Sequence, residues 1–200
     1  MLALPQSTEV RRPLPKAQLY KRFDWKPSQR ESFDGDVSRL DFVNWITPRT
    51  LPAIAEGTEV KEIYVVEVAL KNRDFDIKNI TLLAKSIPQR VIYLLRFEDE
   101  AMLAVYHSKL FTAPWQSLDS ATVALSGLNL DAVWQSLVSS IGQFSVEQEN
   151  TLSEQIKVDE ERDKLLRQIA ALERQMNATK QPRRKRELFL ELQKLNKSLC

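Results

Sequence analysis

Residues 61–71 read KEIYVVEVALK, and this stretch decides the fold. Val, Ile and Tyr favour strands, and apolar side chains occupy both alternating sets of positions along the stretch. A strand that is apolar on both faces needs cover on both faces. We therefore predict a strand over residues 61–71 that lies at the centre of a sheet.

Weaker patterns on both sides of this strand complete a domain over residues 37–144. Hydrophobic spacing and turn residues predict strands over residues 37–45, 91–97, 101–109 and 121–125, and helices over residues 77–87 and 129–141. The strands and helices neither alternate along the chain nor separate into two blocks. We therefore expect an α+β domain, with a small mixed or antiparallel sheet and helices on one face.

The segments outside this domain have different compositions. Residues 1–36 contain several prolines and show no lasting periodicity, so we interpret them as an extended N-terminal segment that packs on the domain or on a neighbour. Residues 145–200 show the spacing of a helical seam, interrupted near Pro182. The apolar residues of the seam are Leu165, Ile169, Leu172, Met176, Leu188, Leu192, Leu195 and Leu199. Two seams of equal length predict a C-terminal antiparallel helical hairpin that resembles a coiled coil.

This C-terminal arm is electrically polarised, although the whole chain carries a net charge of only +2. Residues 145–163 hold seven acidic and two basic side chains, whereas residues 180–197 hold seven basic and two acidic ones. The cations at the tip are Lys180, Arg183, Arg184, Lys185 and Arg186. Such a cluster is suited to contact an acidic partner protein or the phosphates of DNA or RNA.

The sequence shows no catalytic constellation. The glycines are isolated from one another, so a phosphate-binding loop is not predicted, and His107 is the single histidine. Cys200 is the single cysteine, which excludes an intramolecular disulfide. We expect no metal and no cofactor. The N-terminus lacks the features of a secretory signal, and no long apolar run is present, so we expect a cytoplasmic protein.

One enzymatic alternative is a divergent metal-dependent nuclease. In a restriction-type site, an Asp on one strand and a Glu-x-Lys on the next hold a divalent ion. Asp41, Glu67 and Lys71 are the candidates, but the residue two positions after Glu67 is Ala69 and not a lysine. The simpler interpretation is a carboxylate at the edge of the sheet with a solvated or salt-bridged lysine.

Several segments together resemble a bacterial family of unknown function whose genes lie beside Snf2-type helicases and DNA methyltransferases in restriction and phage-defence loci. The segments are residues 10–16 (VRRPLPK), 61–71, 127–131 (GLNLD) and 180–192. The chain departs from that family at Gln89, where an aromatic residue is usual, and at Phe189, where an asparagine is usual. The resemblance implies an accessory protein of antiviral defence and supplies no catalytic residue.

These observations favour a non-catalytic accessory or adaptor subunit of a nucleic-acid-directed assembly. In this interpretation the arm binds a partner protein, such as a helicase or methyltransferase subunit. A direct DNA- or RNA-binding protein that uses the basic tip remains an alternative, and the nuclease is a third.

Overall fold

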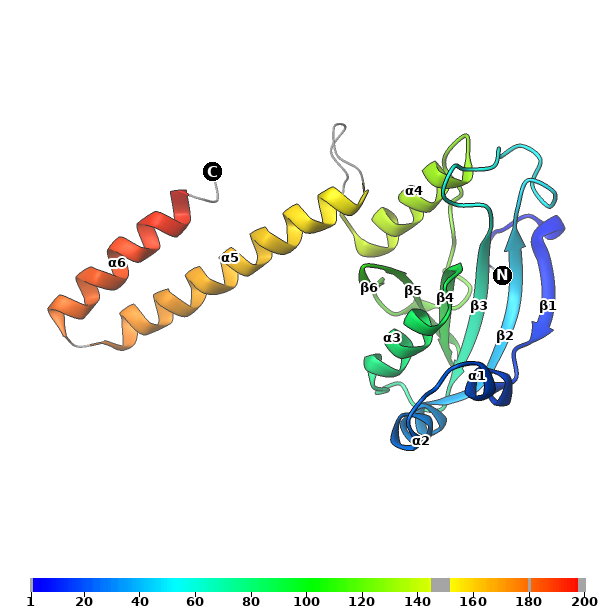
Figure 1. The fold of residues 1–200 in the computed structure, drawn as a ribbon, viewed down its shortest axis with the longest axis horizontal. Helices are drawn as coiled ribbons and strands as arrows, with labels where there is room; N and C mark the ends of the chain where they lie inside the picture. The colour runs from blue at the N-terminus through cyan, green and yellow to red at the C-terminus, as the bar shows by residue number, and fades with distance from the viewer. Residues whose placement is uncertain (1, 145–151, 180, 198–200) are drawn as a thin grey trace. The chain divides into compact units, whose positions relative to one another are not determined.

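The computed structural model describes residues 2–144, 152–179 and 181–197. The chain divides into two compact units, Met1–Ser145 and Val146–Cys200. The first unit contains a mixed sheet with helices, and the second contains two helices (Figure 1). None of the described helices combines the length and the apolar content that a membrane crossing requires.

The sheet has seven strands, and six of them lie side by side in the order β1-β2-β3-β4-β5-β6. Their bounds are β1 Glu9–Pro13, β2 Val37–Ile46, β3 Ile63–Leu70, β4 Arg90–Phe97, β5 Glu100–His107 and β6 Lys109–Thr112. A short β7, Gln116–Ser117, also pairs with β5. The strand predicted from residues 61–71 is β3, and its place between β2 and β4 confirms that it is central.

The pairing of β3 with β4 is parallel, whereas the other described pairs are antiparallel. Helix α3, Ile77–Ser86, connects β3 to β4 as the crossover that a parallel pair requires. The Asp76 side chain accepts a hydrogen bond from the backbone N–H of Lys78 and caps this helix. Of the two predicted alternatives, a mixed or an antiparallel sheet, the structure therefore has the mixed one.

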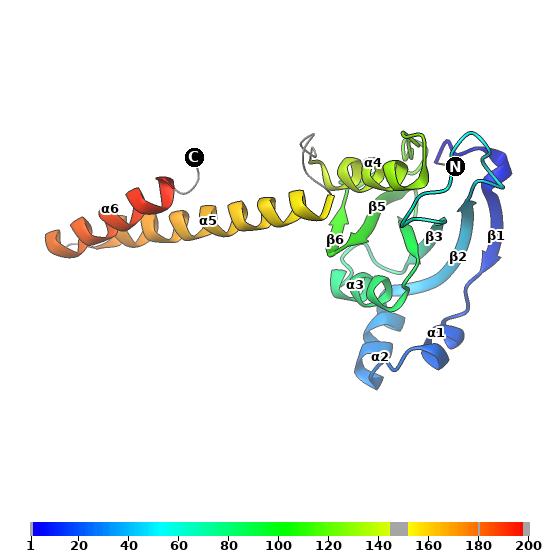
Figure 2. The same cartoon turned by 45° about the horizontal axis from the view of Figure 1, so that its top comes forward.

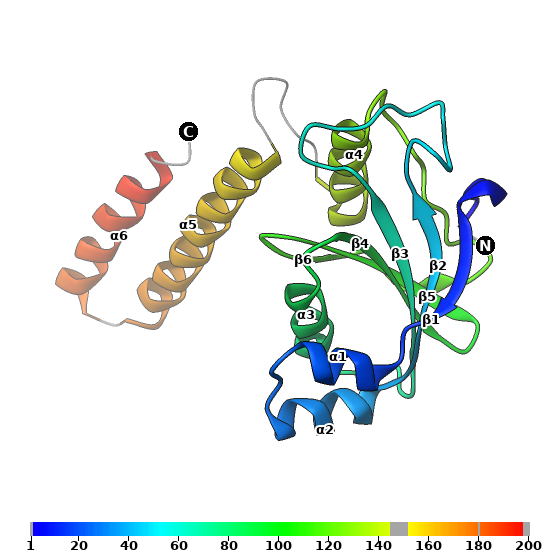
Figure 3. The same cartoon turned by 45° about the vertical axis from the view of Figure 1, so that its right-hand side comes forward.

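Helices cover both faces of the sheet, so the expectation of cover on one face was wrong. Val66, Val68 and Leu70 of β3 share one hydrophobic cluster with Leu19 and Phe33 of the N-terminal helices. Helix α4, Leu130–Gly142, lies on the opposite face and contacts β5 and β6 (Figures 2 and 3). The reason is that Ile63 and Val65, on the second face of β3, are as fully buried as the first set and also need cover.

Residues 1–36 are not the extended segment that their prolines suggested. After β1 the chain forms two helices, α1 over Lys16–Arg22 and α2 over Pro27–Asp36. Pro15 stands at the N-cap of α1 and Pro27 in the first turn of α2, where a missing N–H costs nothing and the fixed φ favours a helix. The prolines therefore begin these helices.

The strand predicted over residues 121–125 is also absent. There the chain makes only an isolated bridge, between Thr122 and Leu2. The backbone N–H of Val123 donates to the Leu2 carbonyl at 3.0 Å. Ala121 and Val123 are buried, so their apolar character reflects burial beside the N-terminus.

Asp131 ties the start of α4 to the loop that precedes β3. Its carboxylate accepts backbone hydrogen bonds from Thr58 at 2.6 Å and from Val60 at 2.7 Å, and a longer one from Glu59. A Cβ at Gly57 would lie 2.4 Å from Asp131 Oδ1, so glycine permits this close approach. Burial alone would raise the pKa of Asp131, but these hydrogen bonds outweigh it and hold the pKa below the ordinary 3.8.

The substitution Asp131→Asn is expected to lower the free energy of unfolding by about 1 kcal/mol at pH 7, because it weakens charge-assisted hydrogen bonds at a partly exposed site. A depressed pKa stabilises the fold above the unfolded-state value near 3.8, and this stabilisation is lost as the pH falls through the lower folded-state value. The free energies of unfolding of the parent protein and of Asp131→Asn, measured in urea, should therefore differ at pH 7 and converge below the folded-state pKa of Asp131. Asp119→Asn, at an exposed carboxylate, is the matched control. An equal difference at both pH values would contradict this account.

Candidate functional site

The basic tip lies at the start of α6, Pro182–Lys197, which follows α5, Leu152–Ala178. Arg183, Lys185 and Arg186 are exposed. Lys180 and the side chain of Arg184 lie outside the part of the chain that the structure describes. Cations at a helix N-terminus oppose the helix dipole, and the first turn of α6 has no described acid to offset them.

The predicted seam is buried unevenly along α5 and α6, which contact each other. Ile169, Leu188 and Leu192 are buried, with exposed fractions of 8%, 2% and 6%. The half-buried members are Leu165, Leu172, Met176 and Leu195. Leu199 lies outside the described residues. Figure 1 shows α6 running back beside α5.

A second face of α6 bears large apolar side chains that the contact with α5 does not cover. Phe189 is 50% exposed and Leu190 is 52% exposed. Arg186 precedes them by three and four residues, and Arg183 precedes Arg186 by three, so all four residues share one side of the helix. We call these four residues the outer face of α6. The sequence could have predicted this exposed apolar face, because positions 189 and 190 fall outside the leucine spacing of the seam.

The residues of the nuclease alternative are only partly brought together. Asp41 of β2 and Glu67 of β3 are direct cross-strand partners. Lys71, however, follows the end of β3, and its Nζ donates to the Asp34 carbonyl at 2.6 Å, near the C-terminus of α2. Free carbonyls at a helix end attract a lysine in this way. Lys71 therefore binds the C-terminal end of α2 and does not complete a metal site with the two carboxylates.

The two carboxylates have arginine partners instead. Asp41 Oδ2 lies 2.5 Å from Arg39 Nε, and Glu67 Oε1 lies 3.4 Å from Arg96 Nη1. Glu67 is 6% exposed, so Arg96 neutralises a carboxylate that is nearly buried. Within the described ranges, no group of three or more His, Cys, Asp and Glu side chains could hold a metal ion. Arg96 lies on β4, and no sequence pattern predicted its pairing with Glu67.

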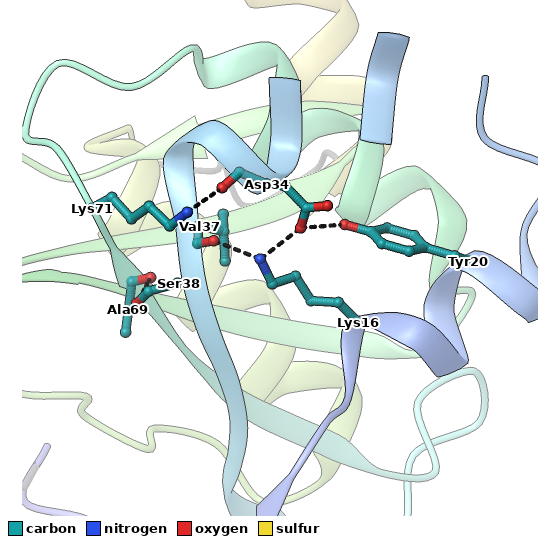
Figure 4. A network of polar contacts seen from close by, with 7 residues as sticks. All are labelled: Lys16, Tyr20, Asp34, Val37, Ser38, Ala69 and Lys71. Atoms are coloured by element: carbon teal, nitrogen blue, oxygen red, sulfur yellow. Dashed lines mark hydrogen bonds and ion pairs between the residues drawn. The ribbon is translucent and has the colours of Figure 1, made fainter. Parts of the chain in front are cut away.

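Lys71 belongs to a polar network that joins α1, α2 and β2 (Figure 4). Lys16 Nζ donates to Asp34 Oδ1 at 2.6 Å and to the Val37 carbonyl at 2.7 Å. Tyr20 Oη donates to the same Asp34 oxygen at 2.7 Å. Burial and this hydrogen bond raise the pKa of Tyr20. The network fixes α1 on the sheet, and its groups satisfy one another.

Asp34, at the centre of this network, is stabilised as the ionised carboxylate. Burial alone would raise its pKa, but the hydrogen bonds from Lys16 and Tyr20 and the charges of Lys16 and Lys71 outweigh burial. The pKa of Asp34 therefore lies below the ordinary 3.8. An ionised Asp34 with a neutral Tyr20 is the form that holds α1 and α2 together at neutral pH.

His107 is half-buried at the end of β5. Its Nδ1 lies 3.4 Å from Trp134 Nε1 of α4, in the geometry of a weak hydrogen bond. Burial and the nearby charge of Arg90 lower the pKa of His107. A neutral imidazole that contacts an α4 tryptophan is consistent with a residue that helps to seat this helix.

Comparison with known proteins identifies a family and no characterised relative. No curated protein and no solved structure matches the chain. One family model matches residues 2–199, which is nearly the whole chain and includes both compact units. The protein therefore belongs to the family described as Domain of unknown function (DUF4391).

Proposed function

We propose that this protein is a non-catalytic accessory subunit that acts in the cytoplasm, within a nucleic-acid-directed assembly. In this proposal α5 and α6 close as an antiparallel hairpin along the seam, and the outer face of α6 binds a partner protein. The partner is a nucleic-acid enzyme, such as the helicase or methyltransferase subunit of a defence system. Residues 145–200 then serve as the docking arm.

The exposure of Phe189 and Leu190 beside Arg186 is the observation that supports this proposal most strongly. Arginine is among the residues that dominate binding energy at protein interfaces, and aromatic residues are enriched there. An exposed phenylalanine and leucine stabilise a lone helix little, because the hydrophobic effect rewards burial. A partner that covers them gains apolar area and can meet Arg183 and Arg186 with acidic side chains.

An enzymatic role is not part of the proposal. Lys71 does not join Asp41 and Glu67, and each of these carboxylates already pairs with an arginine. A direct nucleic-acid contact through the tip is the second candidate, since Arg183, Lys185 and Arg186 are exposed together. Such a contact would depend steeply on salt, because bound cations release the counterions of the phosphates.

The test is affinity purification of the full chain from cells that make it naturally, with quantitative mass spectrometry. The Phe189→Glu variant is expected to lose its partner, with affinity reduced about 30-fold or more, as for a hot-spot residue. Gln175→Glu, at an exposed position of α5, adds the same charge and should retain the partner. Undiminished recovery with Phe189→Glu would contradict the proposal. If instead Arg183→Glu with Arg186→Glu abolishes a salt-sensitive affinity of the purified protein for DNA, the second candidate is correct.

A further inference from the structure

The first compact unit contains an open cavity of about 450 Å³. It lies between β1, α1 and the face of the sheet that the N-terminal helices cover. Its volume lies in the range of ligand pockets. Leu19 and Val91, both buried, form part of its apolar lining, together with Phe23 and Phe42. Because the Lys16 and Asp34 network fixes α1, this wall of the cavity is held in place.

One wall of the cavity is an ordered stack of aromatic rings. The rings of Trp45 and Tyr64 are nearly parallel, 4° apart with centroids separated by 6.0 Å, and Phe42 meets Tyr64 edge to face. Trp45 Nε1 donates to Glu62 Oε2 at 3.0 Å, which fixes the indole. Trp45 is nevertheless 37% exposed, so part of the indole is accessible. An ordered, accessible indole is ready to stack on another planar ring.

The charged residues that line the cavity have one sign, and the nearby Glu62 carboxylate is hydrogen-bonded to Trp45 and Tyr64 at its edge. Arg12 of β1 and Arg22 of α1 line it, and none of the described lining residues is acidic. Neither arginine forms an ion pair with a described acid. Arg22 instead lies over the Phe23 ring, with 5.7 Å between the guanidinium carbon and the ring centroid. An apolar aromatic cavity with two uncompensated cations fits a ligand that has a planar ring and a negative charge.

We propose that this cavity holds one nucleotide of a single-stranded nucleic acid, with the base stacked on Trp45 and a phosphate between Arg12 and Arg22. Bases in a duplex are already stacked, so a duplex cannot offer a ring to Trp45. A free nucleotide is disfavoured for two reasons. Among the described residues no glycine lines the cavity, so the backbone cannot cradle a phosphate group there. Besides Tyr64, only Gln18 and Gln89 offer uncharged polar side chains in the described lining, which is few for holding a separate nucleotide. A stacking platform with nearby cations is how proteins hold single strands without reading their sequence.

This inference does not depend on the arm, and its test uses the full chain. Fluorescence anisotropy with fluorescein-labelled (dT)12 at low salt is expected to show binding that Trp45→Ala weakens on the order of 10-fold. Trp45→Phe keeps a stacking ring and should retain most of the affinity. Arg12→Glu and Arg22→Glu should each weaken binding and reduce the salt slope by about 0.7. Thermal unfolding of each variant verifies that the fold persists.

The controls separate this cavity from other sources of affinity. Arg49→Glu reverses an exposed arginine of the same unit that does not line the cavity, and it should leave binding nearly unchanged. Reversal of Arg183 and Arg186 should also leave (dT)12 binding intact, even if it abolishes partner capture by the arm. The proposal is overturned if the parent protein does not bind (dT)12, if folded Trp45→Ala binds as the parent does, or if Arg49→Glu weakens binding as much as Arg12→Glu. Equal affinity for dTMP or for a 12-base-pair duplex would identify a different occupant and also overturn it.

Discussion

Aspartate in place of both Ile169 and Leu188 is expected to separate α5 from α6, while the sheet-containing unit remains folded, and under the proposed function this variant no longer binds the partner. Both side chains are buried within the second unit, at 8% and 2% exposure. A carboxylate left without a partner in such a position costs several kcal/mol, on the order of 3 or more for the pair of substitutions. A short helix such as α6 is marginal without packing, so we expect far-ultraviolet circular dichroism to report a loss of helix.

The matched control places the same substitutions at exposed positions of the same helices, Gln168→Asp and Gln193→Asp. It reproduces the poor helix propensity and the charge of aspartate without disturbing the seam. The control should retain its helix content. Tryptophan fluorescence reports the first unit alone, because the four tryptophans all lie before residue 145, and its unfolding curve should be unchanged in both variants. Intact helix content in the Ile169 and Leu188 variant would show that the seam does not hold the arm closed.

Phe33→Ala is expected to destabilise the first unit by about 3–5 kcal/mol, the usual cost of removing a buried phenylalanine. Phe33 is fully buried on α2 and meets the Trp25 ring edge to face, with centroids 5.1 Å apart. It belongs to the cluster that joins α1 and α2 to β3. Such a loss is a large part of the stability of a typical domain, so the urea midpoint should fall strongly.

Phe33→Leu is the conservative comparison and should cost less than about 1.5 kcal/mol, because most of the volume is kept. Chemical unfolding followed by tryptophan fluorescence measures both variants. A cost of Phe33→Ala no larger than that of Phe33→Leu would show that α2 is not held through this side chain. The same loss would loosen α1, so the affinity of the cavity for (dT)12 should fall along with stability.

Some elements of the fold could be predicted from local sequence patterns, and others could not. The apolar residues of 61–71 and the hydrophobic spacing over residues 77–87 and 129–141 are local patterns, and the structure confirms β3, α3 and α4. The prolines at positions 15 and 27 were ambiguous, since proline both interrupts a chain and begins a helix. Only the packing of Leu19 and Phe33 on the sheet shows that helices follow them.

The candidate sites also divide into those made of neighbouring residues, which the sequence predicts, and those made of distant residues, which it does not. The cations of the tip and the spacing of the seam could be read from neighbouring residues on one helix. The cavity could not, because Arg12, Arg22, Trp45 and Tyr64 are spread over more than fifty positions and meet only when β1 and α1 pack beside β2 and β3. The pairing of Glu67 with Arg96 likewise depends on the parallel register that places Ala69 opposite Arg96.

The sequence by itself determined which segments are helices and strands where periodicity is strong, and that β3 has neighbours on both sides. It did so because side-chain spacing within one element follows from backbone geometry. Tertiary structure alone decided that β3 and β4 are parallel, that α4 covers the second face and that Lys71 turns to α2. These outcomes depend on contacts between residues distant in the chain, whose free energies appear only when the whole sheet is formed.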